Sequence, residues 1–369
     1  MRIERIGYLE GLRGLAALQV VLLHFVTAFL PDTAEHAPVR ILWDGHTAVY
    51  VFFLISGAVL TPSFARGGPW PRQAAKRLVR LGLPVAAASV CALVLLAVLP
   101  HAHKDAAVVS GSAWLTMDSS GAPTIGHLMR EVSLDSLLLG YREYTLFTPI
   151  AGRLPLLEQS LDAPFWSLHL ELYGSFLVLG LVSLRSRWLH AAAVGLCAAL
   201  FGAQPLFLFV IGHLCATRLT RPGVPLLGSA LIGLGLALSA SKDWAAVESL
   251  RGAMTWLSPP NLFQFQSQLA AVALFIGVLF SPGGQKLLSC AACRWLGRLS
   301  FSIYLLHFPI LFTLACAGFI PLADALPYPA AAAVTFGFYG IAVLLAASAF
   351  ARWIDRPAIH LSRGLDRAR

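Results

Sequence analysis

The sequence predicts an all-α polytopic membrane protein with about ten transmembrane helices, both termini in the cytoplasm and one long outer loop. Composition is the first support for this class. Hydrophobic residues make up 57% of the 369 residues and charged residues only 12%, whereas about 25% are charged in an ordinary globular domain. The second support is that the apolar residues form runs long enough to cross a bilayer. The third is that the basic residues gather on one side of the resulting path.

The apolar runs form ten segments separated by polar turns. Most have close to the ~20 residues that a membrane-crossing helix needs. The fifth and sixth are shorter, so we expect them to tilt or to form a hairpin that does not cross fully. The predicted spans are residues 12–30, 48–65, 81–100, 164–184, 188–202, 204–217, 224–241, 263–280, 299–320 and 330–350.

The charges between the segments predict the orientation. If the N-terminus is cytoplasmic, 20 of the 27 Lys and Arg residues lie on the cytoplasmic side. Cytoplasmic loops are enriched in Lys and Arg, so this split places both termini in the cytoplasm. The basic residues are spread through short loops, so the net charge of +9 does not indicate nucleic acid as a partner.

We expect residues 1–369 to form a single membrane domain, because the chain shows no repeat, low-complexity tract or appended soluble domain. Residues 101–163 are predicted to be an outer loop, partly helical, that serves as a lid or acceptor platform. The alternative is a plain tether. Residues 351–369 are predicted to be a basic cytoplasmic tail. An apolar stripe in the outer loop consists of Ile125, Leu128, Met129, Val132 and Leu139.

The first segment carries two ionisable side chains on one predicted face. Arg13 and His24 are eleven residues apart, so on a helix they point the same way, about 16 Å apart. Glu171 in the fourth segment is predicted at the depth of His24. We therefore expect its carboxylate to accept a hydrogen bond from the imidazole and to orient His24 as a base. A buried ion pair that locks two helices is the alternative, and His169 is a rival base.

A basic run precedes the third segment. Arg77 and Arg80 share a helix face at spacing i, i+3, beside Lys76. With Arg13 and Arg298 they could form a basic mouth suited to phosphate or pyrophosphate. The alternative is that these loops are basic only for topological reasons.

Polar side chains also interrupt the second and ninth segments, at Ser56, Tyr304 and His307. Taken singly, each is explained most simply by close helix packing. Cys290 and Cys293 have the spacing of metal ligands, but no second pair follows nearby. We therefore predict no metal site.

Together these motifs resemble acyltransferase family 3, the integral-membrane O-acyltransferases that modify bacterial envelope polysaccharides and other glycosides. The resemblance covers the chain from end to end. The matching motifs are Leu9-Glu10-Gly11-Leu12-Arg13-Gly14 with His24, Phe52-Phe53-x-x-Ser56-Gly57, Arg77-x-x-Arg80, Trp166-Ser167-Leu168-x-x-Glu171, Leu296-Gly297-Arg298-x-Ser300 with Ser302-x-Tyr304-Leu305-x-His307, and Trp353-Ile354-Asp355-Arg356-Pro357.

The resemblance implies transfer of an acyl group, acetyl by family frequency, from cytoplasmic acyl-CoA to a hydroxyl of a glycan or glycoside. It implies a bacterial inner membrane protein in contact with membrane lipid and without a bound cofactor. His24 is similar to the family's essential histidine, Arg13 to its partner arginine and Glu171 to the acid of the Trp motif. Arg77 and Arg80 would hold the acyl-CoA donor.

Further substrate-binding positions are expected at Lys76, Arg298, Ser56, Trp166, Tyr304 and His307. His24 would act as a general base or carry the acyl group transiently. A competing function is a proton-coupled transporter or flippase of a lipid-linked saccharide, with His24 and Glu171 as a proton relay. A membrane scaffold without catalytic activity is a third.

Overall fold

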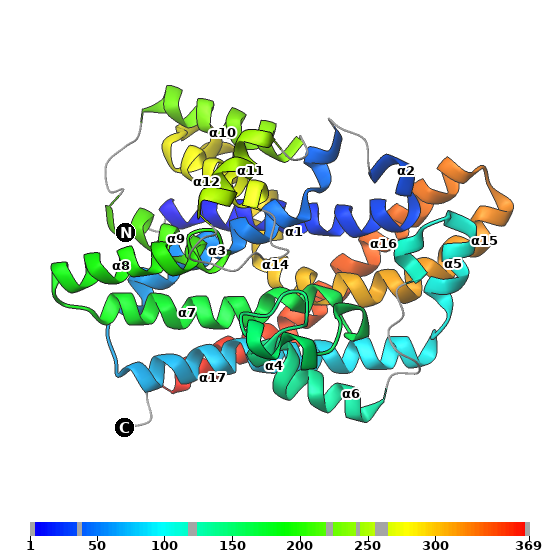
Figure 1. Cartoon of the computed structure of the whole chain (residues 1–369). Helices are drawn as coiled ribbons and strands as arrows, with labels where there is room; N and C mark the ends of the chain where they lie inside the picture. Colours follow the sequence, from blue (N-terminus) through cyan, green and yellow to red (C-terminus); the bar gives the residue numbers. More distant parts are fainter. Residues whose placement is uncertain are drawn as a thin grey trace.

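The computed structural model describes residues 4–34, 39–116, 124–218, 224–240, 244–254 and 265–365. These residues form helices joined by short connections, and no strand occurs among them. The helices pack lengthwise into an elongated bundle (Figure 1). The predicted all-α class is therefore confirmed.

Within the described residues, six helical segments are long and apolar enough to cross a membrane. A seventh results if α12 (Phe265–Phe280) and α13 (Pro282–Leu288), which are bent by 98°, count as one span. The six are α1 (Glu4–Phe29), α3 (Gly45–Ala65), α4 (Trp70–Val98), the 3₁₀ turn η6 (Ala163–Ser167) with α7 (Leu168–Ser183), α14 (Ala291–Ile310) with the π turn η7 (Leu311–Ala315) and α15 (Cys316–Ala325), and α16 (Tyr328–Phe350) with the π turn η8 (Ala351–Asp355) and α17 (Arg356–Gly364).

Three further apolar helices are shorter than an upright span, namely α8 (Arg187–Phe201), α9 (Leu206–Arg218) and α10 (Pro225–Ala240). Each of the ten predicted apolar segments thus coincides with a helix, although the number that crosses the membrane remains a prediction. The helices at the first, third and ninth segments begin well before the predicted spans. Helix α4 begins at Trp70, so Arg77 and Arg80 lie on its first turns, and α14 begins at Ala291.

Glycines bring α1 and α14 into close contact along the centre of the bundle. A Cβ added to Gly14 would lie 2.7 Å from the backbone nitrogen of Gly297, and a Cβ on Gly297 would lie 2.0 Å from the carbonyl oxygen of Glu10. Backbones can approach this closely only where side chains are absent. This contact brings the Arg13 and His24 helix against the helix that carries Tyr304 and His307.

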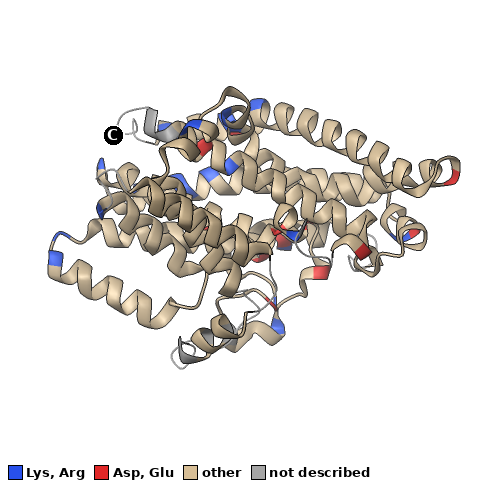
Figure 2. Cartoon of the chain, turned by 90° about the horizontal axis from the view of Figure 1, so that it is seen from above, with Lys and Arg blue, Asp and Glu red and all other residues tan. Residues whose placement is uncertain are grey.

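Both ends of the described chain lie at the same end of the bundle (Figure 1). Most of the Lys and Arg residues also gather toward that end, whereas many Asp and Glu residues lie farther along the bundle (Figure 2). This arrangement agrees with the charge split that predicted a cytoplasmic side. The orientation itself remains a prediction.

Short helices occupy the predicted outer loop between α4 and η6. In α6 (Ile125–Arg130) the apolar residues Ile125 and Met129 are exposed, as suits a helix that lies on a membrane surface. The other elements of this region are α5 (Ala102–Ser110), η2 (Ala113–Thr116), the π-helical η3 (Glu131–Leu139), η4 (Thr148–Arg153) and η5 (Leu157–Gln159). Elsewhere, short elements are α2 (Pro31–Ala34), η1 (Val39–Trp43) and α11 (Ala245–Met254).

The residues predicted as a tail continue the last long helix instead. From Ala351 to Gly364 the chain is helical, and α17 packs on α4. Asp355 is buried there and forms an ion pair with Arg80. The C-terminal segment therefore contributes to the packed bundle.

Candidate active site

A cavity of about 220 Å³ lies between α1, α3, α4, α7 and α14. We call it the donor cavity. Six predicted site residues line it together with apolar side chains such as Phe52 and Leu168. The six are Arg13, Ser56, Arg77, Arg80, Glu171 and Tyr304.

Two of the three arginines in the donor cavity have acid partners. Nη2 of Arg77 lies 2.7 Å from Oε1 of Glu171, and Arg80 pairs with Asp355. By contrast, the Arg13 side chain forms no hydrogen bond or salt bridge within the described residues. The sequence motif around Asp355 was recognised, but its role as the Arg80 partner was not predicted.

The predicted contact between Glu171 and His24 is wrong. Oε1 of Glu171 accepts hydrogen bonds from Arg77 and, at 2.9 Å, from Oγ of Ser56. Residues 163–167 form a 3₁₀ turn, so α7 starts only at Leu168. The prediction rested on Glu171 and His24 having the same depth in the membrane. Depth does not determine the direction in which a side chain points from its helix.

His24 contacts a second histidine instead. Nδ1 of His24 lies 2.9 Å from the carbonyl oxygen of Val20 and 3.1 Å from Nε2 of His307. Nδ1 of His307 lies 2.8 Å from the carbonyl oxygen of Tyr304 and 3.1 Å from that of Ile303. The His307 ring is fully buried on α14. His307, which the sequence explained most simply by helix packing, therefore lies in direct contact with the candidate base His24.

These partners determine which nitrogens carry hydrogen. Nδ1 of His307 faces carbonyl oxygens, so it donates, and Nε2 of the neutral ring is an acceptor. Nδ1 of His24 faces a carbonyl oxygen and this acceptor, so it also donates. The lone pair of His24 therefore lies on Nε2, which can take up a proton or an acyl group.

An aromatic side chain from the outer region covers His24. The Trp114 ring lies 5.5 Å from the His24 ring between centroids, and Phe308 packs edge-on at 5.5 Å. Ser112 holds this segment to α1, because its Oγ donates to the carbonyl oxygen of Thr27 at 2.7 Å. Sequence reasoning missed Trp114, since nothing in the pattern of a connecting segment indicates which residue reaches the site.

Four predicted substrate-binding residues lie outside the donor cavity, namely Lys76, Trp166, Arg298 and His307. Trp166 belongs to η6 and packs on Tyr144, with 4.7 Å between ring centroids. Lys76 and Arg298 do not line the cavity, and Arg298 is exposed on α14. Arg298 precedes Tyr304 by six residues on α14 and therefore points to a different face of that helix. The basic mouth therefore consists of Arg13, Arg77 and Arg80.

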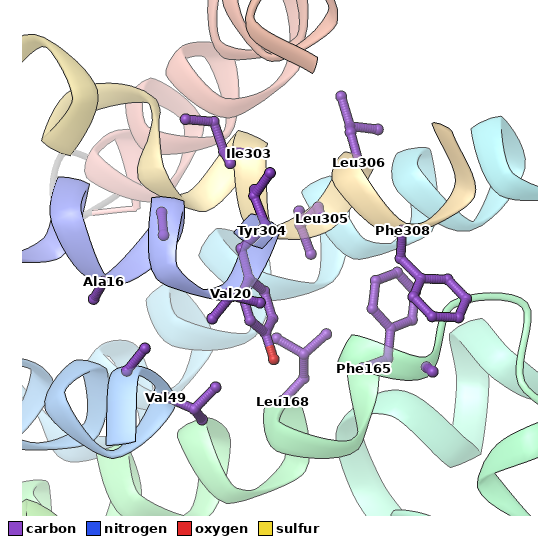
Figure 3. Packing of buried hydrophobic residues seen from close by; sticks show 14 of the residues in the cluster. Ala16, Val20, Val49, Phe165, Leu168, Ile303, Tyr304, Leu305, Leu306 and Phe308 are labelled. Carbon is purple, nitrogen blue, oxygen red and sulfur yellow. The ribbon is translucent and has the colours of Figure 1, made fainter. Parts of the chain in front are cut away.

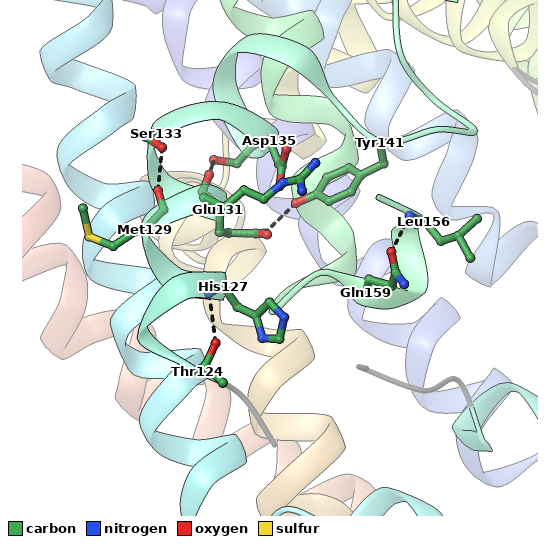
Figure 4. A network of polar contacts seen from close by, with 11 residues as sticks. Thr124, His127, Met129, Glu131, Ser133, Asp135, Tyr141, Leu156 and Gln159 are labelled. Atoms are coloured by element: carbon green, nitrogen blue, oxygen red, sulfur yellow. Dashed lines mark hydrogen bonds and ion pairs between the residues drawn. The ribbon is translucent and has the colours of Figure 1, made fainter. Parts of the chain in front are cut away.

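A second polar region lies in the outer segment, where three acids are buried. Oε1 of Glu131 accepts a hydrogen bond from the Tyr141 hydroxyl at 2.5 Å, and Arg130 pairs with Asp135 at 2.9 Å (Figure 4). Both carboxylate oxygens of Asp162 are buried without a hydrogen-bond partner. Burial raises the pKa of Glu131 to about 8, and burial with the nearby Glu131 raises the pKa of Asp162 well above its usual value.

No cluster of three or more His, Cys, Asp or Glu side chains that could hold a metal ion occurs within the described residues. The Cys290 Sγ accepts a hydrogen bond from the backbone nitrogen of Cys293 as the cap of α14. Their spacing is thus explained by helix capping.

Apolar helices of membrane-spanning length, with arginines in a cavity that leads toward a histidine pair, define an integral membrane protein with an internal polar site. The family profile described as acyltransferase domain matches residues 6–352. The chain belongs to acyltransferase family 3, as its motifs indicated. Comparison with curated proteins and with solved structures finds no match.

Proposed function

We propose that the protein transfers a short acyl group, acetyl in the simplest case, from cytoplasmic acyl-CoA to a hydroxyl of a glycan or glycoside. The acceptor would approach from the outer side of the bacterial inner membrane. The acyl carbon exchanges its bond to the CoA sulfur for a bond to the acceptor oxygen. The hydroxyl proton ends on the CoA thiol. The observation that carries the proposal is the arginine-lined cavity that leads toward His24.

The charges of the donor cavity support an anionic donor. Arg77 and Arg80 are compensated by Glu171 and Asp355, whereas Arg13 has no salt bridge in the described chain. A phosphate group would form charge-assisted hydrogen bonds with such an arginine. The cavity volume of about 220 Å³ is below the ~300–1,000 Å³ of pockets for larger ligands. It therefore suits the pantetheine end of CoA with a short acyl group.

The histidine pair supports two routes for the transfer. In the first, Nε2 of His24 takes the proton of the acceptor hydroxyl as the oxygen attacks the thioester. In the second, Nε2 attacks the thioester, CoA leaves as the thiolate, and the hydroxyl then displaces the imidazole. In both, Nδ1 of His24 donates to Nε2 of His307 and so stabilises the positive charge that develops on the ring. A trapped acyl-histidine in a rapid quench would distinguish the second route.

The outer side supports an acceptor with apolar faces. Trp114 is partly exposed over His24, and an aromatic ring can pack on the face of a sugar. Glycans and glycosides carry such faces and many hydroxyls. His24 thus lies between a basic cavity and an aromatic cover.

The test uses purified protein in lipid nanodiscs with ¹⁴C-acetyl-CoA and bacterial envelope glycans. We expect label in the glycan fraction, and we expect His24→Ala to reduce it by about 10²- to 10⁴-fold. His360→Ala serves as the matched control, because His360 is an exposed histidine on α17. Movement of a labelled lipid-linked saccharide without consumption of acetyl-CoA would contradict the proposal and favour a flippase.

A further inference from the structure

The donor cavity ends one helical turn short of His24. On α14, Ser300 and Tyr304 line the cavity, and His307 follows on the same face, about 4.5 Å further along the axis. On α3 the cavity reaches Val49, four residues after the helix start. Gly45 at the start of α3 packs against Leu23 of the antiparallel α1, so Val49 lies about one helical turn to the cavity side of His24. His24 itself does not line the cavity.

The Tyr304 side chain lies across this gap. It extends from α14 toward Leu168 with Val20 and Val49 beside it (Figure 3). Its ring is buried, with Phe52 at 5.9 Å on the cavity side and His307 at 6.0 Å on the other, between centroids. The ring therefore separates the cavity from the histidine pair.

Two hydrogen bonds hold the Tyr304 hydroxyl in place. It donates to the carbonyl oxygen of Pro164 at 2.6 Å and lies 2.7 Å from Oγ of Ser167. Since its single hydrogen goes to Pro164, Ser167 must donate to Tyr304. Both partners belong to the 3₁₀ turn η6 at the start of α7.

We infer that Tyr304 is a movable barrier between the donor cavity and His24, and that it sets the access and size of the acyl group; this rests on the proposed function. Ser167 Oγ already lies 3.3 Å from the Pro164 carbonyl oxygen. If Tyr304 swings away, Ser167 can donate to that carbonyl, so no buried acceptor is left unpaired. His24 is partly exposed, and the closed position keeps the thioester apart from any water that contacts its ring.

A labelling experiment tests the barrier without relying on activity. Position 24 is made a cysteine by His24→Cys, and inside-out membrane vesicles are treated with a membrane-impermeant maleimide. Mass spectrometry separates the peptide that contains position 24 from the native cysteines. We expect slow labelling with Tyr304 present and labelling faster by about tenfold or more with Tyr304→Ala, because the ring and both hydrogen bonds are lost.

Tyr304→Phe keeps the ring but loses the hydroxyl, so its labelling rate should lie between the two. Tyr304→Leu is made in parallel in case the alanine variant does not fold. Tyr328→Phe is the control. The Tyr328 hydroxyl donates to the Phe29 carbonyl oxygen at 2.6 Å, and Tyr328 does not line the cavity. Rapid labelling with Tyr304 in place, or equal rates in all Tyr304 variants, would overturn the barrier.

An activity measurement then links the barrier to transfer. In the His24 protein, Tyr304→Ala and Tyr304→Phe should raise acceptor-free release of CoA from acetyl-CoA relative to acyl transfer, and should improve the use of butyryl-CoA. A parallel fall of hydrolysis and transfer, with their ratio unchanged, would instead indicate a packing role. If labelling depends on Tyr304 but the wild type transfers no acyl group, the proposed function fails while the barrier stands.

Discussion

The donor cavity and the outer acidic region both bury charged side chains, but they compensate the charges differently. In the cavity, Glu171 pairs with Arg77 at 2.7 Å, and Asp355 pairs with Arg80. In the outer region, Glu131 has a tyrosine hydroxyl as its side-chain partner, and the Asp162 carboxylate has no hydrogen bond.

This difference separates two uses of buried polar groups. Paired acids and arginines remain ionised, because each charge stabilises the other. An unpaired buried acid takes up a proton instead, since desolvation disfavours the charged form. The cavity is thus suited to hold an anionic ligand over a wide pH range. The outer region is expected to change its charge near neutral pH.

The largest effect should follow from removal of His307. His307→Ala leaves Nδ1 of His24 without its acceptor, and we expect kcat to fall by about 10²-fold or more with little change in the KM for acyl-CoA. His307→Gln can still offer an acceptor oxygen and should recover part of kcat. Steady-state kinetics with acetyl-CoA measures both. A rise in KM with unchanged kcat would mean that His307 contacts the donor rather than His24.

The next effect concerns the cavity arginines. Arg13→Ala removes a cation that has no salt bridge in the described chain, so we expect a rise of about 10- to 100-fold in the KM for acyl-CoA and little loss of thermal stability. Arg77→Ala leaves Glu171 as an uncompensated buried charge and should destabilise the protein strongly. Donor kinetics and thermal unfolding in detergent are compared for both. Equal destabilisation by the two variants would show that Arg13 is also structural.

Sequence reasoning grouped Arg13, Arg77 and Arg80 as the structure does, but it wrongly added Lys76 and Arg298 and did not find the partner of the base. The helix periodicity that groups Arg77 with Arg80 is local, and so is the spacing of Arg13 from His24. The contact between His24 and His307 joins two residues that are 283 positions apart in the sequence and lie on different helices. Counting residues from the membrane surface gives the depth of a side chain but not the direction in which it points. The contact between the two histidines depends on how each helix is rotated, and on the close packing of Gly14 against α14.

The class and the apolar segments were predictable for a different reason. A bilayer requires long apolar runs with satisfied backbones, so composition alone indicates them. The outer region has no such requirement. The position of Trp114 over His24 and the burial of Glu131 and Asp162 arise from tertiary packing, which no local pattern reports.

A smaller effect tests the outer region through pH. The pKa of Glu131 is about 8 in the folded protein, against 4.5 for the free side chain. Between these values the folded protein holds a proton that the unfolded chain has lost. Stability should therefore fall as pH rises from about 5 to 8, by about 1.4 kcal/mol per unit for this group. Thermal unfolding in detergent across this range measures the slope.

Glu131→Gln should flatten that slope, because glutamine is neutral and can still accept from Tyr141. Asp162 lies nearby and also has a raised pKa, so part of the slope should remain. The control is His360→Ala, which changes an exposed residue of α17 and leaves the outer region unchanged. An identical slope with and without Glu131 would show that this acid is ionised in the folded protein.

The smallest effect should come from Ser56→Ala in the cavity. Ser56 donates to the same Glu171 oxygen that Arg77 contacts, so the acid keeps its charged partner when the hydroxyl is lost. We expect a loss of about 1 kcal/mol in unfolding free energy and a change in donor KM smaller than that of Arg13→Ala. Denaturant titration and donor kinetics check the two values. If Ser56→Ala lowers the unfolding free energy as much as Arg77→Ala does, then Ser56 rather than the ion pair keeps Glu171 in place. The cavity would then resemble the outer region, where Glu131 depends on a neutral hydroxyl partner.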